Sequence, residues 1–201
     1  MNATTTELDR ASIADRLATL EAERDCKELL ARYGLYADHG LYAEWVDLFT
    51  DDGIMDFTFF DDSDYFDEKM RPRTTDPTTL DLPLRNVRFV GRTQLQDCIR
   101  ADRHERFAGK AQHHMDGQPS VFVQHDEDHA VIISNSIVYC RSVGSTAPSI
   151  QYQNHCVNRW SFRRVDGHWR IAENVRRVMG SGDVADILSS LPPLPGSSAT
   201  A

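Results

Sequence analysis

The residues most able to carry chemistry stand near the end of the first predicted helix and in a later predicted strand. Tyr33 and Asp38 belong to the helix, and the strand contains His113 and His114 as neighbours. A carboxylate near a helix C-terminus opposes the helix dipole, so local stability alone does not explain Asp38. A carboxylate beside an imidazole orients the ring and stabilises its cation, which lets histidine act as a base near neutral pH. These residue types favour proton transfer without a metal, and strand alternation decides which histidine faces inward.

The helical positions of the two candidates leave space between them. Tyr33 and Asp38 are about 140° apart around a helix, so they do not share a face. The arc between them holds Leu30, Gly34 and Ala37. Because two of these residues are small, the arc leaves room for a ligand.

Metal, nucleotide and triad chemistry have little support. The chain contains no G-x-G-x-x-G, G-x-x-x-x-G-K-[ST], H-E-x-x-H or G-x-S-x-G motif. Four residues could be imagined as metal ligands, but they do not show the usual ligand spacing; they are His113, His114, Asp116 and His155. We therefore expect neither a metal nor a cofactor.

Composition limits the class of protein. With 201 residues, 40% hydrophobic and 26% charged, the chain fits one globular domain. No apolar run approaches the roughly 20 residues that a membrane span requires, so we expect no membrane partner. A formal charge of −9 disfavours nucleic acid, because its binders need a basic surface. Much of the acidity lies in residues 61–68, which we interpret as part of a solvated loop reaching Pro83, either disordered or a lid over a site.

The compartment is indicated by the N-terminal segment and the cysteines. The first residues lack the basic segment and apolar stretch of a secretory signal, so we expect a cytoplasmic protein. The cysteines are scattered without a C-x-x-C pair, which is typical of reduced thiols; they are Cys26, Cys98, Cys140 and Cys156.

Hydrophobic periodicity predicts helices first and strands later. The predicted helices cover Ser12–Asp38, Leu41–Phe49, Thr93–Phe107 and a short segment at Val184–Leu188. The predicted strands cover Ile54–Phe60, Asn86–Val90, Gln112–Gln124, His129–Val143, Ile150–Arg164 and His168–Met179. Asp166-Gly167 is a strong hairpin turn signal.

This order favours an α+β fold in which helices close a curved sheet around one pocket. We expect an N-terminal arm at residues 1–11, one domain at residues 12–180, and a partly disordered C-terminal extension at residues 181–201. The predicted ligand of this pocket is a small molecule.

Four segments in this order resemble the SnoaL-like branch of the NTF2-like superfamily: RYGLYADHGLYAEWVDLFTDDG, VGRTQL, HHMDGQPSV and FRRVDGHWRIAEN. The resemblance covers roughly residues 12–180 and implies a cone of curved mixed or antiparallel sheet capped by N-terminal helices. The superfamily includes polyketide cyclases, scytalone dehydratase, bile-acid 7α-dehydratase, hexachlorocyclohexane dehydrochlorinase and ketosteroid isomerase, and also pockets without catalysis. Such motifs identify a fold more specifically than a function.

The resemblance implies a catalytic set. Dehydratase and dehydrochlorinase members carry a helix Asp thirteen residues before the acidic turn, where Asp38 precedes Asp51. They pair it with a strand histidine that matches His114. The bile-acid dehydratase has a Tyr five residues before its Asp, matching Tyr33.

The resemblance also implies residues that contact the substrate. Asn158 is placed like the pocket Asn of scytalone dehydratase. The last strand contains Arg176 and Arg177, and we predict that Arg177 contacts the substrate. Trp45, Phe57 and Tyr139 are predicted to line the pocket. The Tyr-Asp pair of scytalone dehydratase falls at Gly40-Leu41 here, which argues against the same substrate and mechanism.

Taken together, the resemblance implies a cofactor-free lyase or isomerase of the dehydratase type, acting on a small hydrophobic, cyclic alcohol or carbonyl compound. His114 would move the proton, Asp38 would orient it, and Tyr33 and Asn158 would hydrogen-bond the substrate oxygen. Two alternatives stay open: a ligand-binding or assembly module resembling a ring-hydroxylating dioxygenase β subunit, and a polyketide cyclase or epoxide hydrolase. The resemblance further implies a homodimer or higher oligomer formed through the outer sheet face.

Overall fold

The structure is a computed structural model that describes the backbone of residues 3–60, 84–100, 112–141 and 150–193. Side chains are described for residues 12–58, 86–100, 120–138 and 155–193. The predicted acidic loop at residues 61–83 and most of the predicted C-terminal tail lie outside these ranges.

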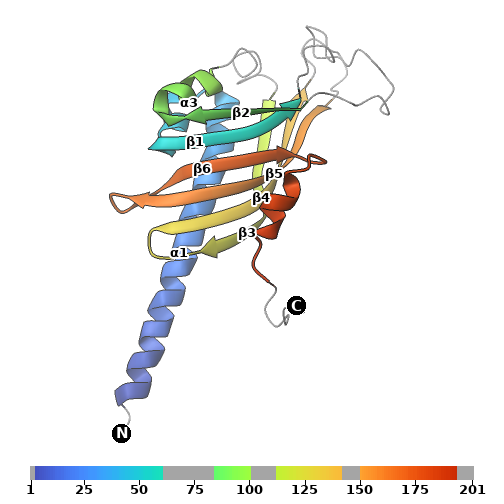
Figure 1. Ribbon diagram of the computed structural model, residues 1–201. Helices are drawn as coiled ribbons and strands as arrows, with labels where there is room; N and C mark the ends of the chain where they lie inside the picture. Colours follow the sequence, from blue (N-terminus) through green and yellow to red (C-terminus); the bar gives the residue numbers. More distant parts are fainter. Residues whose placement is uncertain (1–2, 61–83, 101–111, 142–149, 194–201) are drawn as a thin grey trace.

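Six strands form one curved mixed sheet in the order β2-β1-β6-β5-β4-β3 (Figure 1). The strands are β1 (Phe49–Phe60), β2 (Leu84–Val90), β3 (Gln112–Gln124), β4 (His129–Arg141), β5 (Ile150–Val165) and β6 (His168–Val178). β1 and β6 run parallel, and the other neighbouring strands are antiparallel. The predicted mixed sheet is confirmed, and so is the hairpin at Asp166-Gly167, whose φ angles of 50° and 77° suit a tight primed turn.

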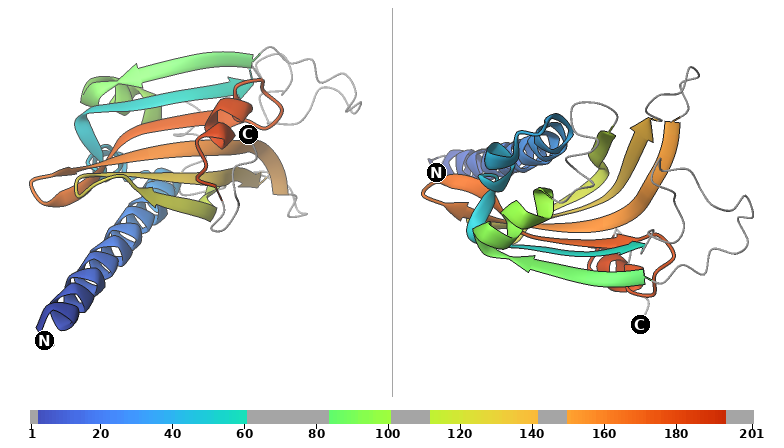
Figure 2. Two further views of the ribbon diagram at one scale, coloured as in Figure 1. Left: turned by 60° about the horizontal axis from the view of Figure 1, so that its bottom comes forward. Right: turned by 90° about the horizontal axis from the view of Figure 1, so that it is seen from above.

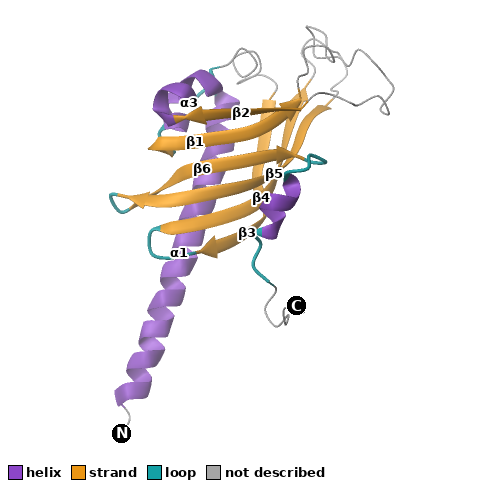
Figure 3. Cartoon of the chain, in the orientation of Figure 1, coloured by secondary structure: helices purple, strands orange, loops and turns teal. Residues whose placement is uncertain are grey.

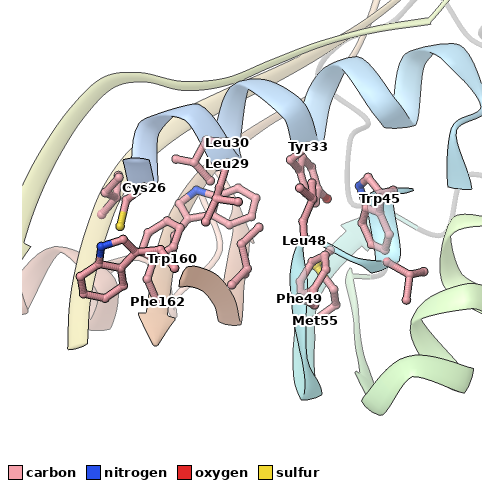
Figure 4. Packing of buried hydrophobic residues seen from close by; sticks show 14 of the residues in the cluster. Cys26, Leu29, Leu30, Tyr33, Trp45, Leu48, Phe49, Met55, Trp160 and Phe162 are labelled. Atoms are coloured by element: carbon pink, nitrogen blue, oxygen red, sulfur yellow. The ribbon is translucent and has the colours of Figure 1, made fainter. Parts of the chain in front are cut away.

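Helix α1 (Ala3–His39) lies along the concave side of the sheet (Figure 2). Its second half buries apolar residues at the spacing of one helix face; these are Cys26, Leu30, Tyr33 and Ala37. They share one core with large side chains of the sheet, among them Trp160, Phe162 and Ile171 (Figure 4). This packing fixes the helix against the sheet and makes the concave side an enclosed face.

The first half of α1 differs from the prediction. The helix begins at Ala3 rather than Ser12, because residues 3–11 contain no Pro or Gly to stop it. The residues whose spacing predicted the helix are exposed rather than packed on the sheet: Ile13, Leu17 and Leu20 are 62%, 54% and 62% exposed. Among the described helices, even this long one does not meet the length and apolarity that crossing a membrane requires.

The second helix is shorter than predicted because the end of its predicted range belongs to a strand of the sheet. α2 covers Tyr42–Val46, and Phe49 already belongs to β1, opposite Ile171 of β6. The predicted turn at residues 50–53 is instead an irregularity inside β1, between Phe49 and Ile54. Gly53 is required there, since a Cβ at this position would lie 2.9 Å from the Thr50 carbonyl oxygen and 2.9 Å from Phe49 Cβ.

Replacing Gly53 by alanine is therefore expected to lower the free energy of unfolding by about 2 kcal/mol, as overpacking against backbone does. Urea unfolding at 25 °C measures the difference. Gly182→Ala is the matched control, because an added Cβ there meets nothing within 4 Å. Equal stabilities of the two variants would contradict this account of the bulge.

Two further helices frame the sheet (Figure 3). α3 (Gly91–Ile99) follows β2 and buries Leu95 and Ile99; residues 101–107 of its predicted range lie outside the described part of the chain. α5 (Val184–Ser189) covers the outer, convex face, where Val184 and Ile187 form a second cluster with Ile133 and Val157. The sheet is thus covered by α1 on the inside and, in part, by α5 on the outside.

Candidate functional site

The concave face changes from apolar to polar along the strands. Near the β5–β6 hairpin it carries Trp160, Phe162 and Ile171, all packed in the α1 core. Farther along β4, β5 and β6 it also buries polar or charged side chains, beside apolar ones such as Val138, Cys156 and Val178: Ser134, Ser136, Asn158, Asn174 and Arg176. Polar groups are rarely buried without a hydrogen-bonding role, so this polar row marks the part of the face suited to bind a ligand.

Hydrogen bonds connect most of the polar row. Asn158 Nδ2 donates to Ser136 Oγ at 2.8 Å, and Asn174 Nδ2 donates to Asn158 Oδ1 at 3.3 Å. Trp160 Nε1 donates to Ser134 Oγ at 3.1 Å. Both asparagines are fully buried. Asn174 Oδ1 receives no hydrogen bond within the described part of the chain, and an unsatisfied buried acceptor is costly. The row can therefore accept one more donor, from water or a ligand.

The two helix candidates are both buried. Tyr33 is 4% exposed and Asp38 is 5% exposed. Leu30, Gly34 and Ala37 are buried as well, so the predicted arc between Tyr33 and Asp38 is the face of α1 turned inward. A buried carboxyl group is costly unless it is compensated, so Asp38 stays a candidate for a specific role at this end of α1.

Tyr33 and Trp45 lie in an aromatic cluster (Figure 4). The ring centroid of Tyr33 is 5.1 Å from that of Trp45, 5.0 Å from that of Trp160 and 6.3 Å from that of Phe49. Trp45 is 1% exposed. Both residues therefore pack the core where α1, α2 and the sheet meet.

The strand register assigns the two histidine positions to different faces. His114 pairs with Val138, and His113 pairs with Tyr139. Directly paired residues share a face of a sheet, and Ser136 places the even-numbered positions of β4 on the concave face. The His114 position therefore belongs to the concave face, and the His113 and Tyr139 positions belong to the outer face. The side chains of these three residues lie outside the described ones.

The two arginines of β6 point to opposite faces, and a bulge decides which one points inward. Strict alternation from Trp169 and Ile171 would place Arg177 on the concave face. The β5–β6 register shifts between Ser161 and Phe162, so Arg176 takes that face instead.

Arg177, the predicted substrate contact, binds two acidic residues of the outer face. It forms ion pairs of 2.8 Å with Asp56 and 3.3 Å with Asp183. The structure thus does not bring Arg177 together with Asn158.

Phe57, Arg176, Asn158 and Ser134 form one row across four strands. Phe57 of β1 is opposite Arg176, Arg176 is opposite Asn158, and Asn158 is opposite Ser134. Phe57 also stacks on Phe89, with ring centroids 5.8 Å apart. No role for Ser134, Ser136 or Asn174 is predicted from the sequence. A polar residue at an alternate strand position where an apolar residue is expected could have identified them. In β6 the bulge interrupts this alternation, so the pattern is not visible for Asn174.

Arg176 supplies a positive charge close to α3. Burial raises the pKa of the Cys98 thiol to about 12, and the guanidinium of Arg176 opposes that shift. Burial likewise raises the pKa of Cys26 to about 12. Because a guanidinium stays protonated, the polar row includes one positively charged group.

The two buried thiols make the free energy of unfolding depend on pH in the alkaline range. In the unfolded chain they lose protons near 9.0, and in the folded chain near 12. The free energy of unfolding should therefore fall as the pH rises from 9 to 12, by at most about 1.4 kcal/mol per pH unit for each thiol. Urea unfolding of Cys26→Ala at pH 8, 9.5 and 10.5 should show a shallower decline than the parent protein. An identical decline would contradict the burial account.

Among the residues with described side chains, no three His, Cys, Asp or Glu residues are grouped as metal ligands. The three cysteines described are free and buried; they are Cys26, Cys98 and Cys156. Among the described side chains, the concave face and α1 therefore offer the hydrogen-bonding groups of the polar row, the Arg176 guanidinium and the buried Asp38 carboxyl group.

No curated protein sequence matches the chain. Among solved structures, it is similar to an NTF2-like protein with a cystatin-like fold from Novosphingobium aromaticivorans, at 22% identity over 89% of this chain and 96% of that chain, with a TM-score of 0.66. A candidate scytalone dehydratase from the same organism shows 14% identity over 81% and 87% of the two chains, with a TM-score of 0.53. The β subunit of a candidate aromatic-ring-hydroxylating dioxygenase, also from that organism, shows 16% identity over 79% and 90%, with a TM-score of 0.55.

These similarities establish the NTF2-like cone fold, here with a sheet that is not closed. The family includes dehydratases, polyketide cyclases and dioxygenase β subunits, so membership leaves several reactions available. The SnoaL-like domain matches residues 18–175, which is most of the described fold, and the chain therefore belongs to the SnoaL-like domain family.

Proposed function

We propose that this protein is a cofactor-free lyase or isomerase of the dehydratase type, acting on a small hydrophobic, cyclic alcohol or carbonyl compound. One observation carries the proposal. A buried carboxyl group, Asp38, lies on the helix that covers the concave face, and the register assigns the position of His114 to that same face. In this proposal, the two groups that transfer the proton come from α1 and from β3.

In the proposed reaction His114 removes a proton from the carbon next to the oxygen-bearing centre. In dehydration the imidazolium then gives this proton to the departing hydroxyl group, which leaves as water, and in isomerisation it returns the proton to another carbon. Asp38 holds the imidazole in place and stabilises its cation. The developing negative charge on the substrate oxygen is stabilised by hydrogen-bond donors of the polar row. Asn158 and Ser136 are suited to this role because they are already aligned by a hydrogen bond of 2.8 Å.

Tyr33 is proposed as a second donor to the substrate oxygen. Its ring is fixed by Trp45 and Trp160, so its hydroxyl is held in one direction. Such fixed donors stabilise charge without reorganising during the reaction.

The chief alternative is a module that binds or assembles without catalysis, like the dioxygenase β subunit that shares the fold. The filled half of the concave face favours it, since Trp160, Phe162 and Tyr33 occupy space that a ligand would need. A polyketide cyclase or an epoxide hydrolase would use similar residues with a different substrate.

Deuterium exchange distinguishes these functions. Candidate cyclic ketones and alcohols are first selected by their effect on thermal unfolding, and then incubated with the protein in D₂O. A lyase loses water and lowers the mass of the substrate. An isomerase keeps the molecule but incorporates deuterium beside the carbonyl carbon. Binding with neither change, across all ligands that stabilise the protein, would contradict catalysis and support the binding module.

A further inference from the structure

Helix α1 has two apolar faces, and only one of them packs on the sheet. The outer stripe, which we define as Ile13, Leu17 and Leu20, lies about 140° around the helix from the buried stripe of Cys26, Leu30, Tyr33 and Ala37. Each residue of the outer stripe is more than half exposed, at 62%, 54% and 62%. An amphipathic helix needs only one apolar face to pack on its own domain. The outer stripe is therefore a candidate contact surface for another molecule.

The outer stripe also lies where the domain cannot cover it. The first half of α1 extends away from the sheet, beyond its β3 edge (Figures 1 and 2). The first residue of α1 in the buried core is Ala22. Within the described part of the chain, no other element reaches the helix before that point. Three large apolar side chains on a protruding helix are characteristic of an interaction surface.

The spacing of the outer stripe matches that of a helix pair. Ile13, Leu17 and Leu20 are separated by four and three residues, which is the repeat of core positions in a coiled coil. Arg24 follows at the next core position and is paired with Asp25 at 2.7 Å. The apolar seam therefore ends where the helix begins to pack on its own sheet.

The flanking charges are self-complementary. Arg16 borders the stripe on one side and Glu21 borders it on the other, and both are exposed. When two copies of α1 run parallel about a two-fold axis, Arg16 of each copy lies beside Glu21 of the other, because these are the flanking positions that pair across such a seam. A two-fold interface uses the same patch on both subunits, and this patch carries both the apolar seam and its matching charges.

We propose that the outer stripe is a homodimer interface, in which α1 pairs in parallel with α1 of a second copy. Leu17 meets its counterpart at the centre of the seam, with Ile13 and Leu20 in the flanking layers. This surface differs from the outer sheet face that family resemblance suggested, and it leaves the concave face untouched. Because the seam is short, the dimer dissociates on dilution.

Sedimentation velocity of the full chain over a range of concentrations tests the proposal. The parent protein should form a dimer, and Leu17→Glu should weaken dimerisation by about 100-fold or more, as loss of a central interface residue does. Two matched controls should keep the dimer. Leu188→Glu changes a side chain that is 45% exposed on α5, and Val121→Glu changes one that is 43% exposed on β3. Circular dichroism confirms that each variant is folded.

A charge exchange tests the parallel pairing itself. Arg16→Glu should weaken the dimer by about 10-fold, since it places like charges together in two symmetric contacts. The double variant Arg16→Glu, Glu21→Arg should restore the parent affinity. A parent protein that is monomeric at every concentration would overturn the proposal. So would a dimer lost in Val121→Glu but kept in Leu17→Glu, or a failure of the double variant to recover.

Discussion

Replacing Asp38 by asparagine is expected to lower kcat by about 10²–10⁴-fold, the usual contribution of an assisted acid–base group. The substitution keeps the volume and hydrogen-bonding shape of a side chain that is 5% exposed, so the fold should survive. It removes the negative charge that is proposed to orient His114 and stabilise its cation. The loss should therefore appear in turnover rather than in substrate affinity.

The pH dependence separates this role from a structural one. Without the carboxylate, the imidazolium is less stable, so the acidic limb of the kcat/KM profile should move to lower pH. Asp15→Asn is the matched control, since Asp15 is an exposed carboxylate on the same helix. If Asp38→Asn kept the parent rate and the parent profile, Asp38 would be excluded from the chemistry.

Coupling between the two groups is part of the same expectation. His114→Gln should abolish the activity that depends on the base, and the double variant should lose little more than the worse single variant, because residues that act as a unit are not additive. Additive losses would mean that Asp38 and His114 act separately.

Local patterns were sufficient to predict most of the sheet. The alternation of β3 to β6 predicted each of these strands to within two residues, and the Asp166-Gly167 turn fixed the hairpin between the last two. These features depend on residues close together in the sequence. The inward arc of α1 between Tyr33 and Asp38 was predictable for the same reason, since helix geometry alone defines it.

Features that depend on tertiary context were not predictable. The local sequence predicts that Phe49 is part of a helix, but Phe49 pairs with Ile171 and belongs to β1. The bulge opposite Ser161 and Phe162 reverses the faces of Arg176 and Arg177, and nothing in the local sequence announces it. A bulge in one strand moves every later side chain of that strand to the opposite face of the sheet. Counting along β6 therefore predicts the wrong face for residues after the bulge.

The polar row shows the same limitation. Ser134, Ser136 and Asn174 become partners of Asn158 and Trp160 only when three strands are aligned in register. From the sequence each is an ordinary polar residue in a strand. The hydrogen bonds that give them a role join residues 16 to 26 positions apart.

Trp160→Ala is expected to lower the free energy of unfolding by about 3–5 kcal/mol, the range for deleting a large buried aromatic side chain. Trp160 is fully buried, its ring contacts Tyr33 at 5.0 Å between centroids, and it joins the apolar half of the concave face to the polar row. Its loss leaves a cavity between α1 and the middle of the sheet. Ser134 Oγ also loses its donor, because Trp160 Nε1 lies 3.1 Å from it.

Trp160→Phe separates these two contributions. The phenyl ring keeps most of the packing against Tyr33 but cannot donate to Ser134, so the expected loss is about 1–2 kcal/mol, that of a smaller cavity and one buried hydrogen bond. Urea unfolding at 25 °C of both variants gives the comparison. A loss below about 1 kcal/mol in Trp160→Ala would mean that α1 does not depend on this contact. If the Phe variant is as unstable as the Ala variant, the main contribution comes from the hydrogen bond to Ser134. In that case the polar row, rather than the aromatic packing, holds α1 over the concave face.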